Sequence, residues 1–155
     1  VQCNRGVNGI EGSVSAAVGY AAVSDRMNFL LVGDLSFFYD MNALWNGHIR
    51  SNLRIVVLNN GGGANFHALP GLDMAGDTRH FVTASHGASA AGWAESQGFT
   101  YLQAADTVSL LAAFDDLLDE TATAPVLLEV FTDAEADAEE LRNYYHAIKE
   151  RWKNF

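Results

Sequence analysis

Cysteine is nearly absent from this chain of 155 residues, which contains only Cys3. A single cysteine excludes an internal disulfide and suits a reducing compartment, so we expect a cytoplasmic protein in which Cys3 is a small, buried apolar residue. No run of about 18 apolar residues occurs, which argues against insertion in a membrane. The first residues contain neither an initiator Met nor a signal sequence, and such a beginning is typical of the middle of a longer chain.

Basic residues are also few: 9 Lys and Arg face 19 Asp and Glu, for a formal net charge of −10. A surface this acidic repels nucleic acid and anionic membranes. A phosphate ligand would therefore be held by a metal ion, helix N-termini and backbone amides. The five histidines show no paired spacing of the zinc-binding type, and neither a Ser-His-Asp arrangement nor a Walker loop is present.

What the chain does have is enough apolar residues, 49% of the total, for one core, and we predict a single domain over residues 1–155. Four apolar runs predict strands: Asn28–Val32, Leu53–Leu58, Phe99–Gln103 and Val126–Phe131. Five segments predict helices: Gly12–Val23 with Ser13 as its cap, Ser36–Trp45, Ser89–Gln97, Thr107–Leu118 and Glu135–Trp152. Trp45, Trp93 and Trp152 are expected to pack within the fold. Residues 64–87 are predicted to form a functional loop with some structure of its own.

Continuous apolar strands that alternate with helices predict an α/β fold, a doubly wound and mainly parallel sheet with helices on both faces. Sheets of this kind bind ligands at the carboxyl ends of their strands. The polar and glycine-rich residues cluster at two such ends, Gly33-Asp34 and Asn59 to Gly63. We therefore expect the functional site at this edge of the sheet.

The residues at these two strand ends suit a magnesium ion, which prefers oxygen ligands in an octahedron. Asp34 leaves one strand and Asn60 leaves the strand after the next helix, and because neighbouring strands lie about 4.8 Å apart, both side chains can reach one ion. The glycines after Asn60 allow a backbone carbonyl, best that of Gly62, to approach it. Amides at the start of the helix after Asp34, with the Ser36 hydroxyl, can meet an anion. Each motif alone is also ordinary turn chemistry, so the spacing carries the argument.

These motifs resemble a known family. The segment GDLSFFYDMNALWNGHIRSNLRIVVLNN resembles the thiamine diphosphate signature, in which Gly-Asp precedes Asn-Asn at a set spacing. Together with NRGVNGIEGSVSAAVG, NNGGGANFHALPG and the later HGASAAGWAESQGFTY, it resembles the C-terminal domain of the 2-succinyl-5-enolpyruvyl-6-hydroxy-3-cyclohexene-1-carboxylate synthases of menaquinone biosynthesis. The resemblance covers nearly the whole chain and implies the thiamine diphosphate-binding fold.

The resemblance implies cofactor-binding roles for particular residues. Asp34 and Asn60 would bind Mg²⁺ or Mn²⁺ through their side chains and Gly62 through its carbonyl. The residues that would line the diphosphate are Gly33, Leu35 and Ser36. The residues that would meet the rest of thiamine diphosphate are Ile10, which bends the cofactor into a V, and Asn8, whose backbone joins that of Ile10 at the aminopyrimidine.

The resemblance also implies a substrate pocket. Arg5 would pair with a substrate carboxylate, for which a guanidinium fork is well suited, and Phe66 and Leu69 would form the apolar wall. Asn65 departs from the family pattern, which has Ile there, and this leaves the selection of substrate open. His67 and His86 lie in or beside the predicted loop, where surface or helix-capping roles compete with contact to substrate.

The implied reaction is decarboxylation of 2-oxoglutarate and addition of the resulting succinic-semialdehyde carbanion to isochorismate. The implied partners are N-terminal and central domains of the same protein, assembled as a homodimer or homotetramer. The activating glutamate is expected on the N-terminal domain, so no catalytic residue is predicted within this chain, and the chain alone is predicted to be inactive.

Two other interpretations stay open. One is a domain of another thiamine-dependent 2-oxo acid decarboxylase or carboligase, such as an acetohydroxyacid-synthase-like enzyme, which would be expected to show Met-Gly in place of Ile10-Glu11. The other is a non-catalytic assembly module that retains the fold. Magnesium-dependent binding of thiamine diphosphate would favour an enzyme domain over an assembly module.

Overall fold

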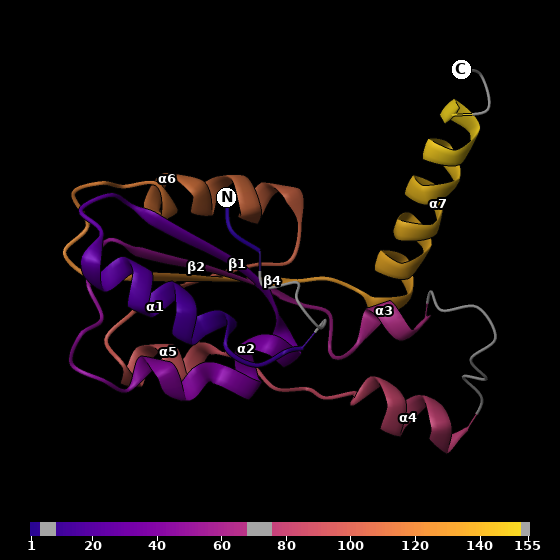
Figure 1. Ribbon diagram of the computed structural model, residues 1–155, viewed down its shortest axis with the longest axis horizontal. Coiled ribbons are helices and arrows are strands. Elements are labelled where there is room, and N and C mark those ends of the chain that lie inside the picture. The colour runs from indigo at the N-terminus through magenta and orange to yellow at the C-terminus, as the bar shows by residue number, and fades with distance from the viewer. Residues whose placement is uncertain (4–8, 68–75, 153–155) are drawn as a thin grey trace. The chain divides into compact units, whose positions relative to one another are not determined.

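A four-stranded parallel sheet is the centre of the computed structural model, which describes residues 1–3, 9–67 and 76–152. Its strands are β1 (Asn28–Gly33), β2 (Leu53–Asn59), β3 (Thr100–Ala104) and β4 (Val126–Phe131). Their order across the sheet is β1-β2-β4-β3, and every neighbouring pair is parallel (Figure 1). The predicted parallel sheet is confirmed, with each strand within one residue of the predicted run.

Helices cover both faces of this sheet, as predicted (Figure 1). On one face lie α1 (Ser13–Val23), α2 (Asp34–Asp40), the 3₁₀ helix η1 (Met41–Leu44) and α5 (Ala91–Ser96). Their apolar side chains, among them Val14, Phe37 and Ala94, pack with Ile55 and Val57 of β2 in one core cluster. On the other face α6 (Thr107–Leu117) buries its own apolar residues against β3 and β4 in a second cluster.

The contacts of the chain divide it into two compact units. The sheet unit comprises Val1–Asn59 and Ser89–Phe131, and the second unit comprises Asn60–Ala88 and Thr132–Phe155. The second unit contains α3 (Ala64–His67), α4 (Asp77–Thr83) and α7 (Ala134–Trp152). The presence of α3 and α4 confirms that the long loop predicted over residues 64–87 has structure of its own. One domain for residues 1–155 stays a prediction.

Several helix boundaries differ from the prediction, and α5 begins two residues later than predicted, at Ala91. Ser13 is not the cap of α1, because Gly12 takes that position in a left-handed conformation (φ 81°) and Ser13 is the first helical residue. The helix predicted over Ser36–Trp45 begins earlier, at Asp34, and its second half is the 3₁₀ helix. Asp40 departs from helical geometry (φ −122°, ψ 11°) where its carboxylate accepts hydrogen bonds from the Ser15 amide (2.7 Å) and hydroxyl (2.6 Å).

Several expected core residues are instead exposed. Cys3 is exposed, so the prediction that it is buried was wrong. Trp93 does pack, and its indole N–H donates to the carbonyl of Met41 at 2.9 Å. Trp45 and Trp152 are 71% and 74% exposed, so the prediction that they pack within the fold was wrong.

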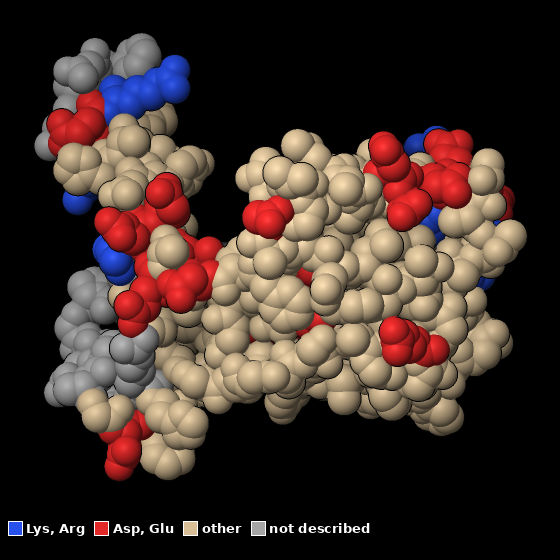
Figure 2. All heavy atoms as spheres, turned by 180° about the vertical axis from the view of Figure 1, so that it is seen from behind, with Lys and Arg blue, Asp and Glu red and all other residues tan. Residues whose placement is uncertain are grey.

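Helix α7 carries its charges in the order that a helix dipole favours. Acidic side chains gather over its first turns and basic ones near its end (Figure 2). Within the part of the chain that the structure describes, no helix has the combined length and apolar character needed to cross a bilayer.

Candidate functional site

Asp34 lies at the carboxyl end of β1. Gly33, the last paired residue of that strand, is opposite Leu58 of β2, and Asp34 follows as the first residue of α2. Only 3% of Asp34 is exposed, and its Oδ1 accepts a hydrogen bond from the Leu35 amide at 2.7 Å. The change from strand to helix therefore holds a largely desolvated carboxylate at the edge where parallel sheets bind ligands.

Asn60 follows directly after β2, and the two polar atoms of its side-chain amide differ in their hydrogen bonding. Its Nδ2 donates to Oδ2 of Asp137 at 3.1 Å, and the same oxygen accepts from the Thr132 hydroxyl at 2.7 Å. Its Oδ1 is buried and has no hydrogen-bond partner among the described residues. A buried acceptor without a donor is unfavourable, and a bound cation would satisfy it.

The glycines after Asn60 are required by how closely the backbone passes another segment. Gly61 and Gly62 have φ angles of 79° and 150°, which side chains rarely allow. A Cβ on Gly62 would lie 2.7 Å from the carbonyl oxygen of Thr83. Hydrogen bonds from Gly63 N to Thr83 O (2.7 Å) and from His86 N to Gly61 O (3.0 Å) join the two segments. The glycine turn therefore has a fixed shape.

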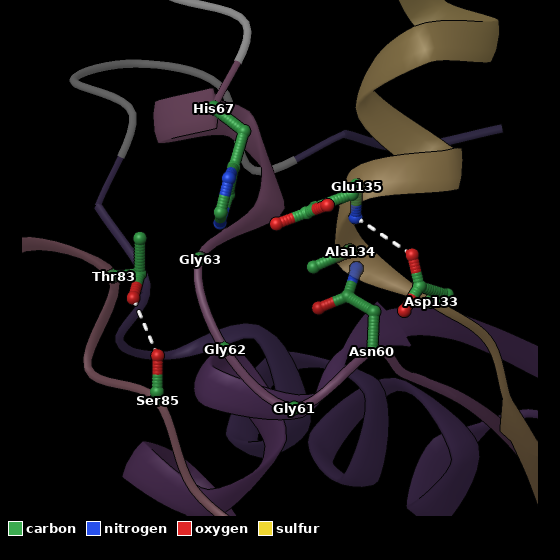
Figure 3. A pocket seen from close by; sticks show the side chains of 10 residues that line it. All are labelled: Asn60, Gly61, Gly62, Gly63, His67, Thr83, Ser85, Asp133, Ala134 and Glu135. Atoms are coloured by element: carbon green, nitrogen blue, oxygen red, sulfur yellow. Dashed lines mark hydrogen bonds between the residues drawn. The ribbon is translucent and has the colours of Figure 1, made fainter. Parts of the chain in front are cut away.

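A pocket of about 360 Å³ opens beside this turn, entirely within the second unit (Figure 3). It is lined by Asn60, Gly61, Gly62, Gly63, His67, Thr83, Ser85, Asp133, Ala134 and Glu135. The side chains of Asn60, His67 and Glu135 point toward one another across it (Figure 3). Hydroxyl groups of Thr83 and Ser85, 2.7 Å apart, form one wall. Because the carboxylates of Asp133 and Glu135 join amide, hydroxyl and carbonyl oxygens here, the lining favours a cation over a bare phosphate.

The donor set fits a hard divalent ion. Asp34 supplies a carboxylate, Asn60 an amide oxygen and Gly62 a carbonyl, which are ligand types that Mg²⁺ prefers. The Gly62 carbonyl accepts from the Ala64 amide at 3.1 Å, and a carbonyl oxygen has two lone pairs. Among the described residues no three His, Cys, Asp or Glu side chains gather as a metal site, so the candidate ligands are of mixed type. Joint binding of one ion by Asp34, in the sheet unit, and Asn60, in the second unit, stays a prediction.

The other predicted site residues are partly described. Leu35 and Ser36 are half-buried in the first turn of α2, and Gly33 is the extended residue before it. Ile10 is 39% and Phe66 38% exposed, so both have surface available for a ligand. Arg5, Asn8 and Leu69 lie outside the described residues, and their predicted roles stay predictions.

Sequence reasoning missed the most heavily bonded buried acid, Glu129 of β4. It is 0% exposed and accepts hydrogen bonds from Asn59, Ser89, Ala90 and Tyr101. The available signal was a single charged residue within an otherwise apolar strand, VLLEVF. Such a residue is seldom fully buried unless its charge is compensated.

Comparison with known proteins agrees with this geometry. Residues 2–130 match the family model described as thiamine pyrophosphate enzyme, C-terminal TPP binding domain. The chain belongs to this family. Thiamine pyrophosphate is another name for thiamine diphosphate, so the predicted cofactor class and fold are both confirmed at the level of the family.

Curated relatives are similar over nearly the whole chain. Three of them are named 2-succinyl-5-enolpyruvyl-6-hydroxy-3-cyclohexene-1-carboxylate synthase. The protein from Bacteroides fragilis is 57% identical over 150 residues, 96% of this chain and 27% of that protein. The protein from Bacteroides thetaiotaomicron is 55% identical over 152 residues (97% and 27%), and the one from Flavobacterium johnsoniae is 41% identical over 154 residues (96% and 26%).

These matches confirm the resemblance seen in the motifs of this TPP-binding domain. The chain spans about a quarter of the length of the curated relatives that it matches, 27% in the first of them.

Proposed function

We propose that this TPP-binding domain holds thiamine diphosphate and Mg²⁺, or Mn²⁺, for a synthase of the kind named in its relatives. One observation supports this most directly: 57% identity over 96% of the chain to a relative of that name. Positions that the motifs single out also have suitable surroundings, above all the Oδ1 of Asn60, which is buried and has no hydrogen-bond partner in the part of the chain that the structure describes. A divalent ion there would satisfy an acceptor that is otherwise unpaired.

In the proposed site Asp34, Asn60 and Gly62 bind the ion, which offsets the charge of the diphosphate in an acidic protein. Gly33, Leu35 and Ser36 lie against the diphosphate, and Asn8 and Ile10 against the rest of the cofactor. Thiamine diphosphate supplies the carbanion chemistry when it is bound, and the residues of the chain bind and orient it.

The proposed reaction of the whole protein is decarboxylation of 2-oxoglutarate followed by transfer of the remaining four-carbon unit to isochorismate, in menaquinone biosynthesis. Arg5 would pair with a substrate carboxylate, and Phe66 and Leu69 would form the apolar wall. Further domains of the same protein, a homodimeric or homotetrameric assembly and a cytoplasmic location belong to the same proposal. The names of the relatives favour this synthase over another thiamine-dependent carboligase and over a non-catalytic module.

Calorimetry of the 155-residue chain tests the proposal. Thiamine diphosphate should bind in the presence of Mg²⁺ and not in the presence of EDTA. Asp34→Asn should weaken Mg²⁺-dependent binding by at least about 10-fold, equivalent to about 1.4 kcal/mol, because one carboxylate ligand is lost. Asp115→Asn, at an exposed carboxylate of α6, is the matched control for loss of one negative charge. Equal binding with and without Mg²⁺, or an unaltered affinity in Asp34→Asn, would contradict the proposal.

A further inference from the structure

Glu129 lies at the centre of a hydrogen-bond network within the sheet unit. It is opposite Val57 of β2 on one side and Gln103 of β3 on the other. Its Oε1 accepts from the Asn59 amide at 2.7 Å, and its Oε2 accepts from the hydroxyls of Ser89 and Tyr101, each at 2.7 Å. The Ala90 amide donates to both oxygens, at 3.0 and 3.1 Å. Four donors therefore surround a side chain that is fully buried.

The arrangement places four donors around one buried carboxyl group. The Ala90 amide and the Asn59 Nδ2 can only donate, whereas each of the two hydroxyls can donate or accept. A buried carboxyl group that accepts hydrogen bonds from several donors is compensated for its loss of water. Glu129 is thus a buried carboxyl group that is held by hydrogen bonds from three separate parts of the chain.

Two of those donors have a special place in the chain. Asn59 is the last residue of the sheet unit before the segment 60–88, and Ser89 is the first residue after it. Both are bonded to the same carboxylate. The segment between them carries the proposed metal ligands Asn60 and Gly62 and the proposed pocket residue Phe66.

We propose that Glu129 is a positioning residue for the cofactor site: it fixes both ends of the segment 60–88 and so determines where Asn60 is presented. This inference rests on the proposed function for its effect on cofactor binding, but its effect on the segment is independent of any ligand. Glu129 does not itself touch the ion or cofactor in this proposal. It acts through Asn59, whose side chain it holds toward the core while the next residue leaves the strand.

The test compares Glu129→Gln with Leu128→Ala in the 155-residue chain. Leu128 is the preceding residue of β4, fully buried in the cluster beneath α6, so its truncation weakens the sheet without touching the network around Glu129. Glu129→Gln keeps the size of the side chain but replaces an acceptor with a donor. Two quantities are measured in each variant: amide hydrogen exchange without ligand, and the Kd of thiamine diphosphate with Mg²⁺.

In the Glu129→Gln variant we expect faster exchange at Gly63 and His86, whose amides join the glycine turn to residues 83–86, and unaltered exchange in β1. We expect the Kd of thiamine diphosphate to rise about 10-fold to 100-fold, as for other residues that orient metal ligands. Leu128→Ala should lower the melting temperature without either effect. Asn59→Ala should reproduce part of the loss, and adding it to Glu129→Gln should cause little more, because both changes break the same contact.

Each alternative result has a definite meaning. If the wild-type chain binds cofactor and Glu129→Gln binds it equally well, the positioning role is wrong while the proposed function stands. If the wild-type chain fails to bind, the proposed function fails for this chain, and hydrogen exchange alone decides whether Glu129 fixes the segment. The third result is that Glu129→Gln speeds amide exchange throughout the sheet, by as much as Leu128→Ala does at the same stability. Glu129 would then have only a general structural role, and the inference would be overturned.

Discussion

The neighbouring residues Asn59 and Asn60 show how one residue type takes two roles. Asn59 is buried and its amide nitrogen donates to Glu129, whereas Asn60 buries an amide oxygen that has no partner among the described residues. An unpaired buried acceptor costs about 1–3 kcal/mol. As a structural residue Asn60 is therefore a poor choice. A cation bound at the proposed site would give this oxygen a partner.

Removing this oxygen should separate stability from binding. Asn60→Ala loses one hydrogen bond to Asp137 but also the unpaired acceptor, so the free energy of unfolding without ligand should change by no more than about 1 kcal/mol. The apparent affinity for Mg²⁺ in the presence of thiamine diphosphate should fall at least about 10-fold, which is about 1.4 kcal/mol. Urea denaturation and calorimetry measure the two quantities. Asn143→Ala, at an exposed position of α7, should change neither, and a large loss of stability without loss of affinity in Asn60→Ala would refute the ligand role.

Gly62 should tolerate no side chain. In Gly62→Ala the new Cβ would lie 2.7 Å from the Thr83 carbonyl, at a φ of 150°, so the turn must move. We expect a loss of about 1–3 kcal/mol in stability, together with weaker cofactor binding. Gly19→Ala is the control, because Gly19 lies within α1 with no atom within 4 Å of an added Cβ. It should raise the melting temperature, since alanine favours a helix by about 0.5–1 kcal/mol.

The elements of the sheet unit could largely be predicted from the sequence, because apolar runs and helical periodicity report burial directly. The rule that ligands bind at strand ends also led to Asp34 and Asn60. The role of Glu129 could not be predicted. Its partners come from three other parts of the chain, and they meet only because β4 lies between β2 and β3, an order that differs from the order in the sequence. Likewise α3 and α4 are short, and no periodicity specifies them.

At the scale of elements, Arg54 joins β2 to the end of α6. It is 1% exposed, its Nε donates to the Leu117 carbonyl (2.8 Å) and its Nη2 to the Asp119 carbonyl (2.6 Å), and Nη1 donates to the carbonyls of Ser51 and Leu53. Burial lowers the pKa of this guanidinium from its usual value. Carbonyls at a helix C-terminus lack partners within the helix, and Arg54 supplies them.

Arg54→Met should therefore destabilise the sheet unit by about 3 kcal/mol, because buried carbonyls lose charged donors. Arg54→Lys should recover little of this, since an ammonium cannot reproduce the fork. The matched control is Arg50→Met. Arg50 also donates to backbone carbonyls, those of Ala22 and Ser24, and it pairs with Asp25 at 3.6 Å, but its side chain is 45% exposed, so its loss should cost less than about 1 kcal/mol. Urea denaturation measures all three. A cost for Arg54→Met no larger than that for Arg50→Met would contradict the capping role.

Tyr101 of β3 should make the stability of the protein depend on alkaline pH. Burial, followed by its hydrogen bond to Glu129, raises the pKa of Tyr101 from 10.0 to about 12. The unfolded chain thus loses this proton at lower pH than the folded one. The contribution of Tyr101 to stability is complete below pH 10 and is lost as the pH rises toward about 12. In Tyr101→Phe this part of the pH dependence should disappear from denaturation curves, and phenolate absorbance should show one fewer late-titrating group. An unaltered pH dependence would contradict the assignment.

At the scale of the whole molecule, the chain passes from one unit to the other after Asn59, before Ser89 and after Phe131. Asn59 and Ser89 are both hydrogen-bonded to the carboxyl group of Glu129. The sheet unit supplies the fold and the proposed ligand Asp34, while the second unit supplies the glycine turn and its pocket. Cofactor binding that requires both would stabilise the chain as a whole. A ligand at 100 times its Kd adds about 2.7 kcal/mol.

This chain should therefore bind thiamine diphosphate without catalysing decarboxylation. It spans 27% of the length of its Bacteroides fragilis relative, and the most buried glutamate that the structure describes, Glu129, is already bonded to four donors. We expect thiamine diphosphate with Mg²⁺ to raise the melting temperature while 2-oxoglutarate releases no carbon dioxide above a protein-free control. Asp34→Asn should abolish the thermal shift. That result would show that the wild-type chain, although inactive, binds its cofactor through Asp34. Carbon dioxide release that depends on both Asp34 and Mg²⁺ would prove this prediction wrong and would mean that the chain supplies its own activating group.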